Sequence, residues 1–137
     1  MKKKLLWVED DALLGRILSR EIENSEFDLI QAKTGQEAMD LLKGIVPDVI
    51  MVDLMLPGGM DGFAILEATD ADPRLKDIPK IVLSNLSRES DLERARKLGA
   101  KRFLIKADMS LEIIMSELRD IVAHTIVRTT PPKEANS

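Results

Sequence analysis

Short apolar runs alternate with amphipathic segments along most of the chain. Five runs rich in Leu, Ile and Val predict the strands of a sheet, because strands buried on both faces are apolar almost continuously. The runs lie at residues 5–8, 27–32, 49–52, 80–84 and 102–106. The second run is more polar than the others, which is typical of an edge strand.

The segments between these runs carry the spacing of amphipathic helices. It is clearest in two segments whose apolar residues fall on one helical face: Leu14, Ile17, Leu18 and Ile22 in the first, and Leu111, Ile114, Met115, Leu118, Ile121 and Val122 in the second. Cap and stop residues bound three further helices. These are 34–44, between Thr34 and Gly44; 61–72, before Pro73; and 87–100, between Ser87 and Gly99. The last has little apolar surface, so we expect it to be mostly exposed.

This strict alternation predicts an α/β protein: a doubly wound parallel sheet with helices on both faces. We expect one domain at residues 1–125. The remaining residues, 126–137, include two prolines and little apolar content, and we interpret them as a disordered tail or a truncated linker.

Composition narrows the possible functions. A chain of 137 residues with a net charge of -4 is an ordinary globular domain, and that charge argues against nucleic-acid binding. There is no cysteine, and the single histidine, His124, cannot build a zinc site alone. The apolar run near the N-terminus is too short for a signal peptide or a membrane span, so we expect a cytoplasmic protein.

Polar residues follow four of the five predicted strands. They are Glu9 and Asp10 after the first strand, Asp53 after the third, and Ser84 and Lys106 at the ends of the fourth and fifth. Because the carboxyl ends of parallel strands meet at one edge, we expect these side chains to converge.

Clustered carboxylates must protonate, pair with a cation such as the Lys106 ammonium, or bind a metal ion. Oxygen ligands favour Mg²⁺, which is commonly completed by a phosphate. A carboxylate beside Mg²⁺ and an ammonium can attack a phosphoryl group. The alternative is that Glu9, Asp10 and Asp53 only cap helices or turns, and that Ser84 and Lys106 are ordinary strand-end residues.

The chain resembles the receiver domains of two-component response regulators. The resemblance runs through "LLWVEDD", "VIMVDLMLPGGMDGF", "KIVLSNL" and "KRFLIKAD", and so covers nearly the whole chain. It implies a flavodoxin-like (βα)5 fold with strand order 2-1-3-4-5.

The resemblance also implies a role for each matching residue. It assigns Asp53 as the phosphoacceptor, with Ser84 and Lys106 as the Ser/Thr and the lysine of the site. For Mg²⁺ it implies Asp10 as a direct ligand, Glu9 as a ligand through water and the Met55 backbone carbonyl as a further ligand. It implies that Phe103 is the aromatic switch residue. Ordinary core packing is the alternative for Phe103. Asp11 falls outside the motif, and we expect it to cap the first helix.

Two features depart from the family pattern. The loop "LPGGMDG" carries an extra glycine, which puts partner contacts there in doubt. Ala107 follows Lys106 where the family usually has a proline in a cis peptide, which leaves the isomer of that bond open.

The implied function is to take a phosphoryl group from a sensor histidine kinase or a histidine phosphotransfer protein. The implied output is the binding of an effector protein, or a homodimer, through the surface of the fourth helix, fifth strand and fifth helix. No separate substrate is expected, so the chain is not an enzyme in the usual sense. Alternatives are a phosphorylation-independent binding module and the N-terminal part of a longer response regulator. A haloacid-dehalogenase type of enzyme would need a second aspartate where Met55 stands.

Overall fold

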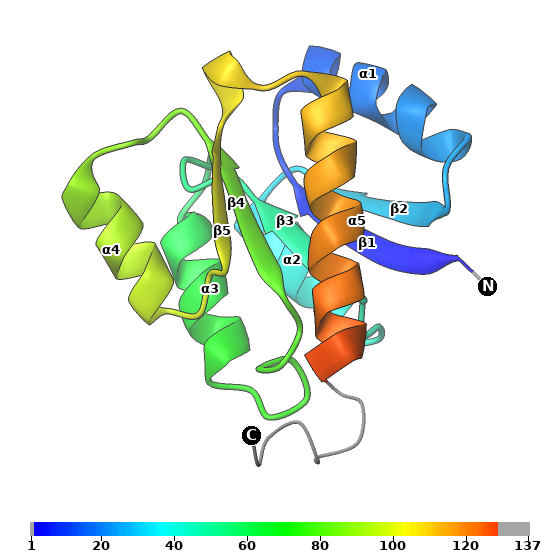
Figure 1. The fold of residues 1–137 in the computed structure, drawn as a ribbon. Helices are drawn as coiled ribbons and strands as arrows, with labels where there is room; N and C mark the ends of the chain where they lie inside the picture. Colours follow the sequence, from blue (N-terminus) through cyan, green and yellow to red (C-terminus); the bar gives the residue numbers. More distant parts are fainter. Residues whose placement is uncertain (1, 129–137) are drawn as a thin grey trace.

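The computed structural model describes residues 2–128, with side chains as far as His124, and this part forms a five-stranded parallel sheet. The strand order is β2-β1-β3-β4-β5, as predicted (Figure 1). The strands are β1 Lys3–Val8, β2 Phe27–Ala32, β3 Val49–Val52, β4 Lys80–Ser84 and β5 Arg102–Ile105. β2 lies at one edge of the sheet, in agreement with its polar sequence.

Helices cover both faces of this sheet (Figure 1). They are α1 Ala12–Glu23, α2 Gly35–Leu42, α3 Gly62–Asp70, α4 Glu89–Lys97 and α5 Leu111–Arg128, with a short 3-10 helix, η1, at Lys106–Asp108. The first and last α-helices pack on one face, and the other three pack on the opposite face. Within residues 2–128, no helix is both long and apolar enough to span a membrane.

Alternation along the strands divides the core into two clusters. Leu5 and Trp7 of β1 face α1 and α5, whereas Leu6 and Val8 face α2 and α3. All four side chains are fully buried, because successive strand residues point to opposite faces and both faces are covered. Trp7 is therefore a core residue.

Most predicted helix caps are present. Asp11 Oδ1 accepts a hydrogen bond from Leu14 N at 3.0 Å, and Thr34 Oγ1 accepts one from Glu37 N at 3.0 Å. Gly99, just after α4, has a φ of +101°, the left-handed conformation that favours glycine at a helix end. The Asp11 side chain therefore caps α1, while its backbone N–H donates a hydrogen bond to Glu9 Oε2 at 3.1 Å.

The predicted Ser87 cap of α4 is wrong. The N-cap is Arg88, which makes no side-chain capping bond, and α4 begins at Glu89. The Arg88 carbonyl accepts hydrogen bonds from Asp91 N and Leu92 N, both at 3.0 Å. Acidic residues at 89 and 91 interact favourably with the helix dipole, so the helix begins without a hydroxyl cap.

The remaining differences lie at element ends. β5 stops at Ile105, so Lys106 begins η1 instead of ending the strand, and α3 stops at Asp70. α5 continues to Arg128, so its backbone includes the first three residues of the segment 126–137 that we interpreted as a tail. Residues 129–137 of that segment lie outside the described residues.

The structure gives the backbone conformation at both departures from the family pattern, the extra glycine in the loop after β3 and Ala107 after Lys106. Gly58 in the longer loop has a φ of +87°, with open space where a Cβ would lie. Residues 2–128 contain no cis peptide bond, so the Lys106–Ala107 bond is trans.

Lys80 is a buried cation at the start of β4, only 1% exposed. Its Nζ donates hydrogen bonds to the carbonyls of Leu75 at 3.1 Å and Lys76 at 3.2 Å, in the turn before the strand. Burial lowers the pKa of Lys80, because the charged form loses its hydration. The side chain therefore connects the β4 strand to the preceding turn while carrying a desolvation cost.

This burial predicts an alkaline pH dependence of stability. The unfolded chain binds the Lys80 proton more tightly than the folded chain, so the free energy of unfolding rises with pH towards the ordinary lysine pKa of about 10.4. In Lys80→Met this contribution is lost, so urea denaturation between about pH 7 and 10 should show the wild type gaining stability relative to the variant. The exposed Lys33→Met variant is the control and should show no such gain. A constant difference between wild type and Lys80→Met would contradict the prediction.

Candidate functional site

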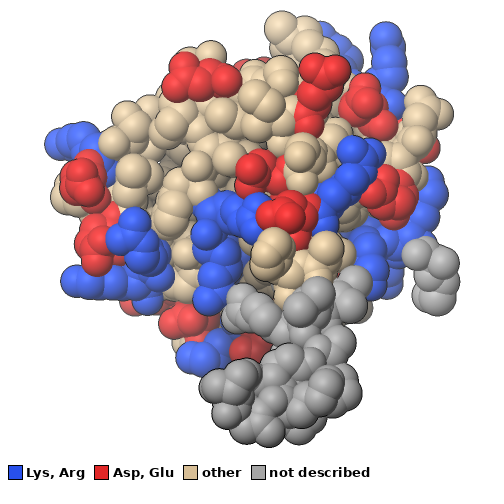
Figure 2. All heavy atoms as spheres, viewed as in Figure 1, with Lys and Arg blue, Asp and Glu red and all other residues tan. Residues whose placement is uncertain are grey.

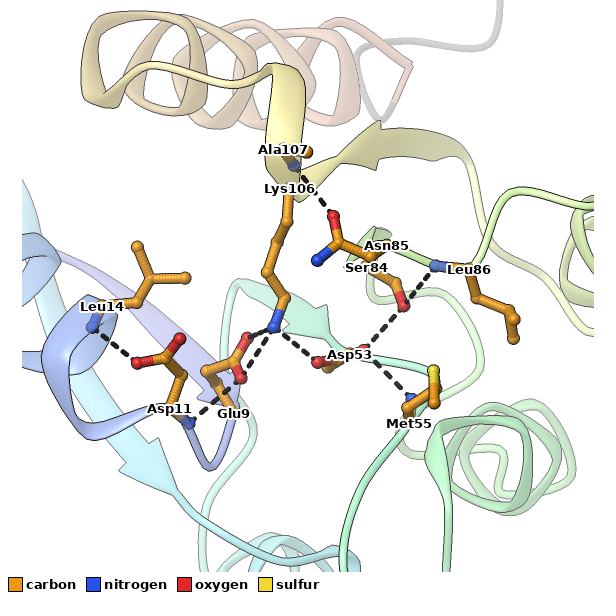
Figure 3. A network of polar contacts seen from close by, with 10 residues as sticks. All are labelled: Glu9, Asp11, Leu14, Asp53, Met55, Ser84, Asn85, Leu86, Lys106 and Ala107. Carbon is orange, nitrogen blue, oxygen red and sulfur yellow. Dashed lines mark hydrogen bonds and ion pairs between the residues drawn. The ribbon is translucent and has the colours of Figure 1, made fainter.

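The polar residues predicted to converge do so at the carboxyl edge of the sheet. Glu9 follows β1, Asp53 follows β3, Ser84 ends β4 and Lys106 follows β5. Their side chains point toward one another in one network (Figure 3). Asp10 also contributes a carboxylate to this edge and is exposed.

Asp53 is the centre of the network and is only 4% exposed. Its Oδ1 accepts hydrogen bonds from Ser84 Oγ at 2.7 Å and from Met55 N at 3.0 Å. Its Oδ2 lies 2.8 Å from Lys106 Nζ. The carboxylate is thus fixed by three donors from three different strand ends or loops (Figure 3).

The backbone after Asp53 depends on a glycine. A Cβ added at Gly62, the first residue of α3, would lie 2.2 Å from the Asp53 carbonyl oxygen and 2.6 Å from Leu54 Cα. Both atoms belong to the backbone and cannot move aside cheaply. The glycine of "MDGF" therefore lets α3 begin directly against the peptide that carries Asp53.

Lys106 joins the two buried carboxylates. Its Nζ lies 3.0 Å from both Glu9 carboxylate oxygens and donates a hydrogen bond to Oε2. Burial alone would lower the pKa of Lys106, but hydrogen bonds with Asp53 and Glu9 outweigh burial and raise it. Burial raises the pKa of Glu9, an effect that the Lys106 hydrogen bond partly offsets. The ammonium therefore stays charged at neutral pH and balances part of the acidic charge.

Three carboxylates are arranged as a divalent cation would require. One oxygen from each of Glu9, Asp10 and Asp53 lies within 4.8 Å of the others. Glu9 Oε1 is buried and accepts no hydrogen bond, although Lys106 Nζ is at ion-pair distance. A buried oxygen with an unused lone pair and an all-oxygen donor set fit a hard ion such as Mg²⁺.

Two predicted residues lie at the edge of this network or outside it. Met55 N–H donates to Asp53, while the Met55 side chain is 60% exposed and makes no contribution to the polar cluster. Phe103 is half-buried on β5 and packs against the α2–α3–α4 cluster. The guanidinium of Arg96 on α4 lies 5.7 Å from the Phe103 ring centroid. The ring therefore borders α4 rather than the carboxylates.

Sequence reasoning missed two residues of the network. Leu86 N donates a hydrogen bond to Ser84 Oγ at 3.2 Å. Asn85 Oδ1 accepts one from Ala107 N at 2.9 Å. The polar Asn85 directly after Ser84 was a usable signal, but its partner 22 residues away was not visible in the pattern. A hollow of about 300 Å³ beside Lys106 is lined in part by Asn85 and Ala107.

Comparison with known proteins supports this arrangement. The family model described as "Response regulator receiver domain" matches residues 5–119. The polar-differentiation response regulator DivK of Brucella ovis is 31% identical over 123 residues, which are 88% of this chain and 99% of that protein. Several other curated relatives are longer, and the part that matches this chain makes up half of their length or less. One is the DNA-binding dual master transcriptional regulator RpaA of a Synechocystis strain, 30% identical over 122 residues, which are 89% of this chain and 50% of that protein.

Solved structures share the architecture. The phosphorylated cyanobacterial phytochrome response regulator RcpA has a TM-score of 0.78 and 28% identity, with 97% of this chain and all of that chain covered. The Mn²⁺-bound response regulator Rcp1 has a TM-score of 0.72 and 27% identity, with 90% and 88% covered. A receiver domain from Methanospirillum hungatei, at 16% identity and a TM-score of 0.86, shares the fold over 93% of this chain and 99% of its own.

The match to the family model spans most of the described residues, and it includes every strand end that contributes to the acidic site. DivK and RcpA each match this chain over nearly their whole length. The chain belongs to the response regulator receiver domain family of two-component signal transduction.

Proposed function

We propose that this domain accepts a phosphoryl group on Asp53 and thereby switches a protein-binding surface. One observation carries the proposal: a nearly buried carboxylate lies between an ammonium, a hydroxyl and two further carboxylates at the end of a central strand. A purely structural aspartate would not need this combination of neighbours, each of which matches a requirement of phosphoryl transfer.

The transfer step uses the Asp53 carboxylate as nucleophile. A carboxylate oxygen attacks the phosphorus of a phosphohistidine, the new O–P bond forms, and the N–P bond of the donor breaks. The electron pair of that bond stays on the histidine nitrogen of the donor. Water later attacks the same phosphorus, so that the O–P bond to Asp53 breaks, inorganic phosphate leaves and the carboxylate returns.

The chain's own residues prepare this step. Lys106 holds one Asp53 oxygen and keeps a positive charge where phosphoryl oxygens arrive. Ser84 donates its proton to Asp53 Oδ1 and can redirect it to a phosphoryl oxygen. Glu9, Asp10, Asp53 and the Met55 carbonyl would hold Mg²⁺, which when bound neutralises negative charge on the phosphoryl oxygens.

The switch follows from the redirected Ser84 hydroxyl. A domain with two close-lying conformations is shifted by a group that makes better contacts in one of them. Movement of Ser84 toward the phosphoryl group leaves space near β5 that the Phe103 ring can occupy. The neighbouring α4 has one buried residue, Ala95, within its own bounds, so it resists displacement weakly.

The partner surface we propose consists of α4, β5 and α5. Receiver domains interact with histidine kinases and effector domains. Acidic and basic side chains are interspersed on the face viewed in Figure 2, and this mixture suits a protein partner better than nucleic acid. We propose an effector protein or a second copy as the partner, in the cytoplasm, with no substrate apart from the phosphoryl donor.

The proposed function is tested with a small phosphoryl donor. Incubation with acetyl phosphate and Mg²⁺ should add one phosphoryl group, seen as a single adduct by intact mass spectrometry. The adduct should be absent when EDTA replaces Mg²⁺. Failure to form an adduct with Mg²⁺ present would overturn the proposal.

The metal ligands can be separated by neighbouring aspartates. Asp10→Ala should weaken Mg²⁺ binding by about tenfold or more, because weak all-oxygen sites depend on each carboxylate. Asp11→Ala should change it little, because Asp11 caps α1 instead. The Mg²⁺ affinity of both variants is measured by titration with Mg²⁺. The signal is the fluorescence of Trp7, which lies two residues before Glu9. Equal losses in the two variants would mean that the wrong aspartate of the run has been assigned.

The switch predicts a specific pattern of hydrogen exchange. With beryllofluoride as phosphoryl mimic, amide protection should change across residues 84–106, which include α4 and β5. The reason is that Ser84 and Phe103 shift together while the sheet stays paired. Changes confined to the residues around Asp10 and Asp53 would leave the site intact but contradict the proposed route to the partner surface.

A further inference from the structure

A hydrogen bond links the two loops that carry Ser84 and Lys106. Asn85 directly follows Ser84, and Ala107 directly follows Lys106. Asn85 Oδ1 accepts from Ala107 N at 2.9 Å, across a sequence separation of 22 residues (Figure 3). The bond therefore joins the residue after the site hydroxyl to the residue after the site ammonium.

This bond lies just beyond the last backbone pair of β4 and β5. The β4–β5 pairing ends at Ser84 and Ile105, so past that point no strand ladder holds the two loops together. Ile105 is the N-cap of η1 and supplies no side-chain capping bond. The first N–H groups of a helix have no partner within the helix. Asn85 supplies the missing acceptor from a different loop.

The donor exists because residue 107 is alanine. A proline has no backbone N–H and could not make this bond. The Asn85–Ala107 bond therefore requires a residue other than proline after Lys106. The trans Lys106–Ala107 peptide presents its N–H toward Asn85.

We propose that Asn85 is a positioning residue for Lys106. By fixing the Ala107 N–H, the Asn85 carboxamide sets the direction in which the chain leaves β5 and so holds Lys106 Nζ within 3.0 Å of Glu9 and 2.8 Å of Asp53. The proposal rests on the proposed phosphoryl transfer, in which Lys106 must lie beside the incoming phosphoryl oxygens.

The test compares two substitutions of nearly equal size. Asn85→Leu removes the acceptor, and Asn85→Asp keeps an acceptor oxygen in the same place. With acetyl phosphate and saturating Mg²⁺, Asn85→Leu should slow phosphorylation on the order of tenfold, because misplacing a catalytic group through its support costs about this much. Asn85→Asp should restore most of the rate. Asn24→Leu, an exposed asparagine after α1, is the control and should leave the rate unchanged.

A double-substitution cycle shows whether Asn85 acts through Ala107. Ala107→Pro removes the donor, so adding Asn85→Leu in that background should change the rate by less than about twofold, since the two residues no longer interact. An equal loss in both backgrounds would overturn the proposal, and so would an unchanged rate in Asn85→Leu alone. Urea denaturation should show little change in stability for Asn85→Leu, which separates positioning from general destabilisation.

Hydrogen exchange at the Ala107 amide tests the positioning role of Asn85 separately from phosphoryl transfer. The Ala107 amide should be protected in the wild type, although the residue is exposed, and should exchange at least about tenfold faster in Asn85→Leu once its acceptor is gone. This measurement needs no phosphorylation. If the wild type takes up no phosphoryl group, the proposed function fails whatever the Ala107 amide does. If phosphorylation proceeds and the Ala107 amide exchanges equally fast in both proteins, only the positioning role of Asn85 is wrong.

Discussion

Asp53→Asn should abolish uptake of a phosphoryl group from acetyl phosphate in the presence of Mg²⁺. An amide oxygen carries no full negative charge and is a far weaker nucleophile than a carboxylate. The substitution is nearly isosteric, and the amide can still accept hydrogen bonds from Ser84 and Met55. Intact mass spectrometry should therefore show an unmodified protein that remains folded.

Asp28→Asn is the matched control for this experiment. Asp28 is exposed on β2, away from the carboxyl edge of the sheet, so the variant should be phosphorylated like the wild type. Phosphorylation of Asp53→Asn at the rate of the wild type would assign the nucleophile to another residue.

Lys106→Met should have the second largest effect. The methionine keeps most of the length of the side chain but leaves Glu9 and Asp53 without their shared ammonium. The phosphoryl oxygens then meet two carboxylates with no fixed positive charge from the protein. We expect phosphorylation by acetyl phosphate to slow on the order of 100-fold, the usual cost of losing one donor that stabilises developing charge.

Lys101→Met provides the comparison for that variant. Lys101 is exposed just before β5 and far along the strand from the acidic site, so its loss should leave the rate unchanged. The phosphorylation rates of both variants are measured as initial rates at several acetyl phosphate concentrations. A rate for Lys106→Met within about threefold of wild type would remove Lys106 from the transfer step, since the loss of a stabilising charge costs far more.

The fold could be predicted from local patterns because each strand is nearly all apolar and each long helix has one apolar face. Leu5 to Val8 are all buried, and the alternation of elements leaves few topologies for a parallel sheet. Strand order came from the resemblance to receiver domains rather than from the pattern itself. The boundaries were less exact, because the start of α4 depends on backbone hydrogen bonds that a serine at 87 does not determine.

The main site could be predicted for a simple geometric reason. Residues that directly follow parallel strands meet at one edge, so Glu9, Asp53, Ser84 and Lys106 could be grouped without knowing any distance. The structure brings all four within one network of hydrogen bonds and ion pairs. The contribution of each to phosphoryl transfer stays a prediction.

Features that depend on contacts formed only in the folded chain were not visible in the sequence. Lys80 looks like a polar start to an apolar strand, and only the folded chain shows its ammonium donating to two carbonyls of the preceding turn. The Gly62 requirement depends on how closely α3 approaches the backbone of Asp53. Asn85 and Ala107 face each other only after β4 and β5 pair.

The central claim is that Asp53 itself carries the phosphoryl group, and borohydride trapping tests it most directly. Borohydride reduces an aspartyl phosphate to homoserine, so reduction after incubation with acetyl phosphate and Mg²⁺ should mark the modified residue permanently. Peptide sequencing by mass spectrometry should then find homoserine at position 53 and unmodified aspartate at positions 10, 11 and 61. Homoserine at any of those other positions, with aspartate intact at 53, would contradict the account.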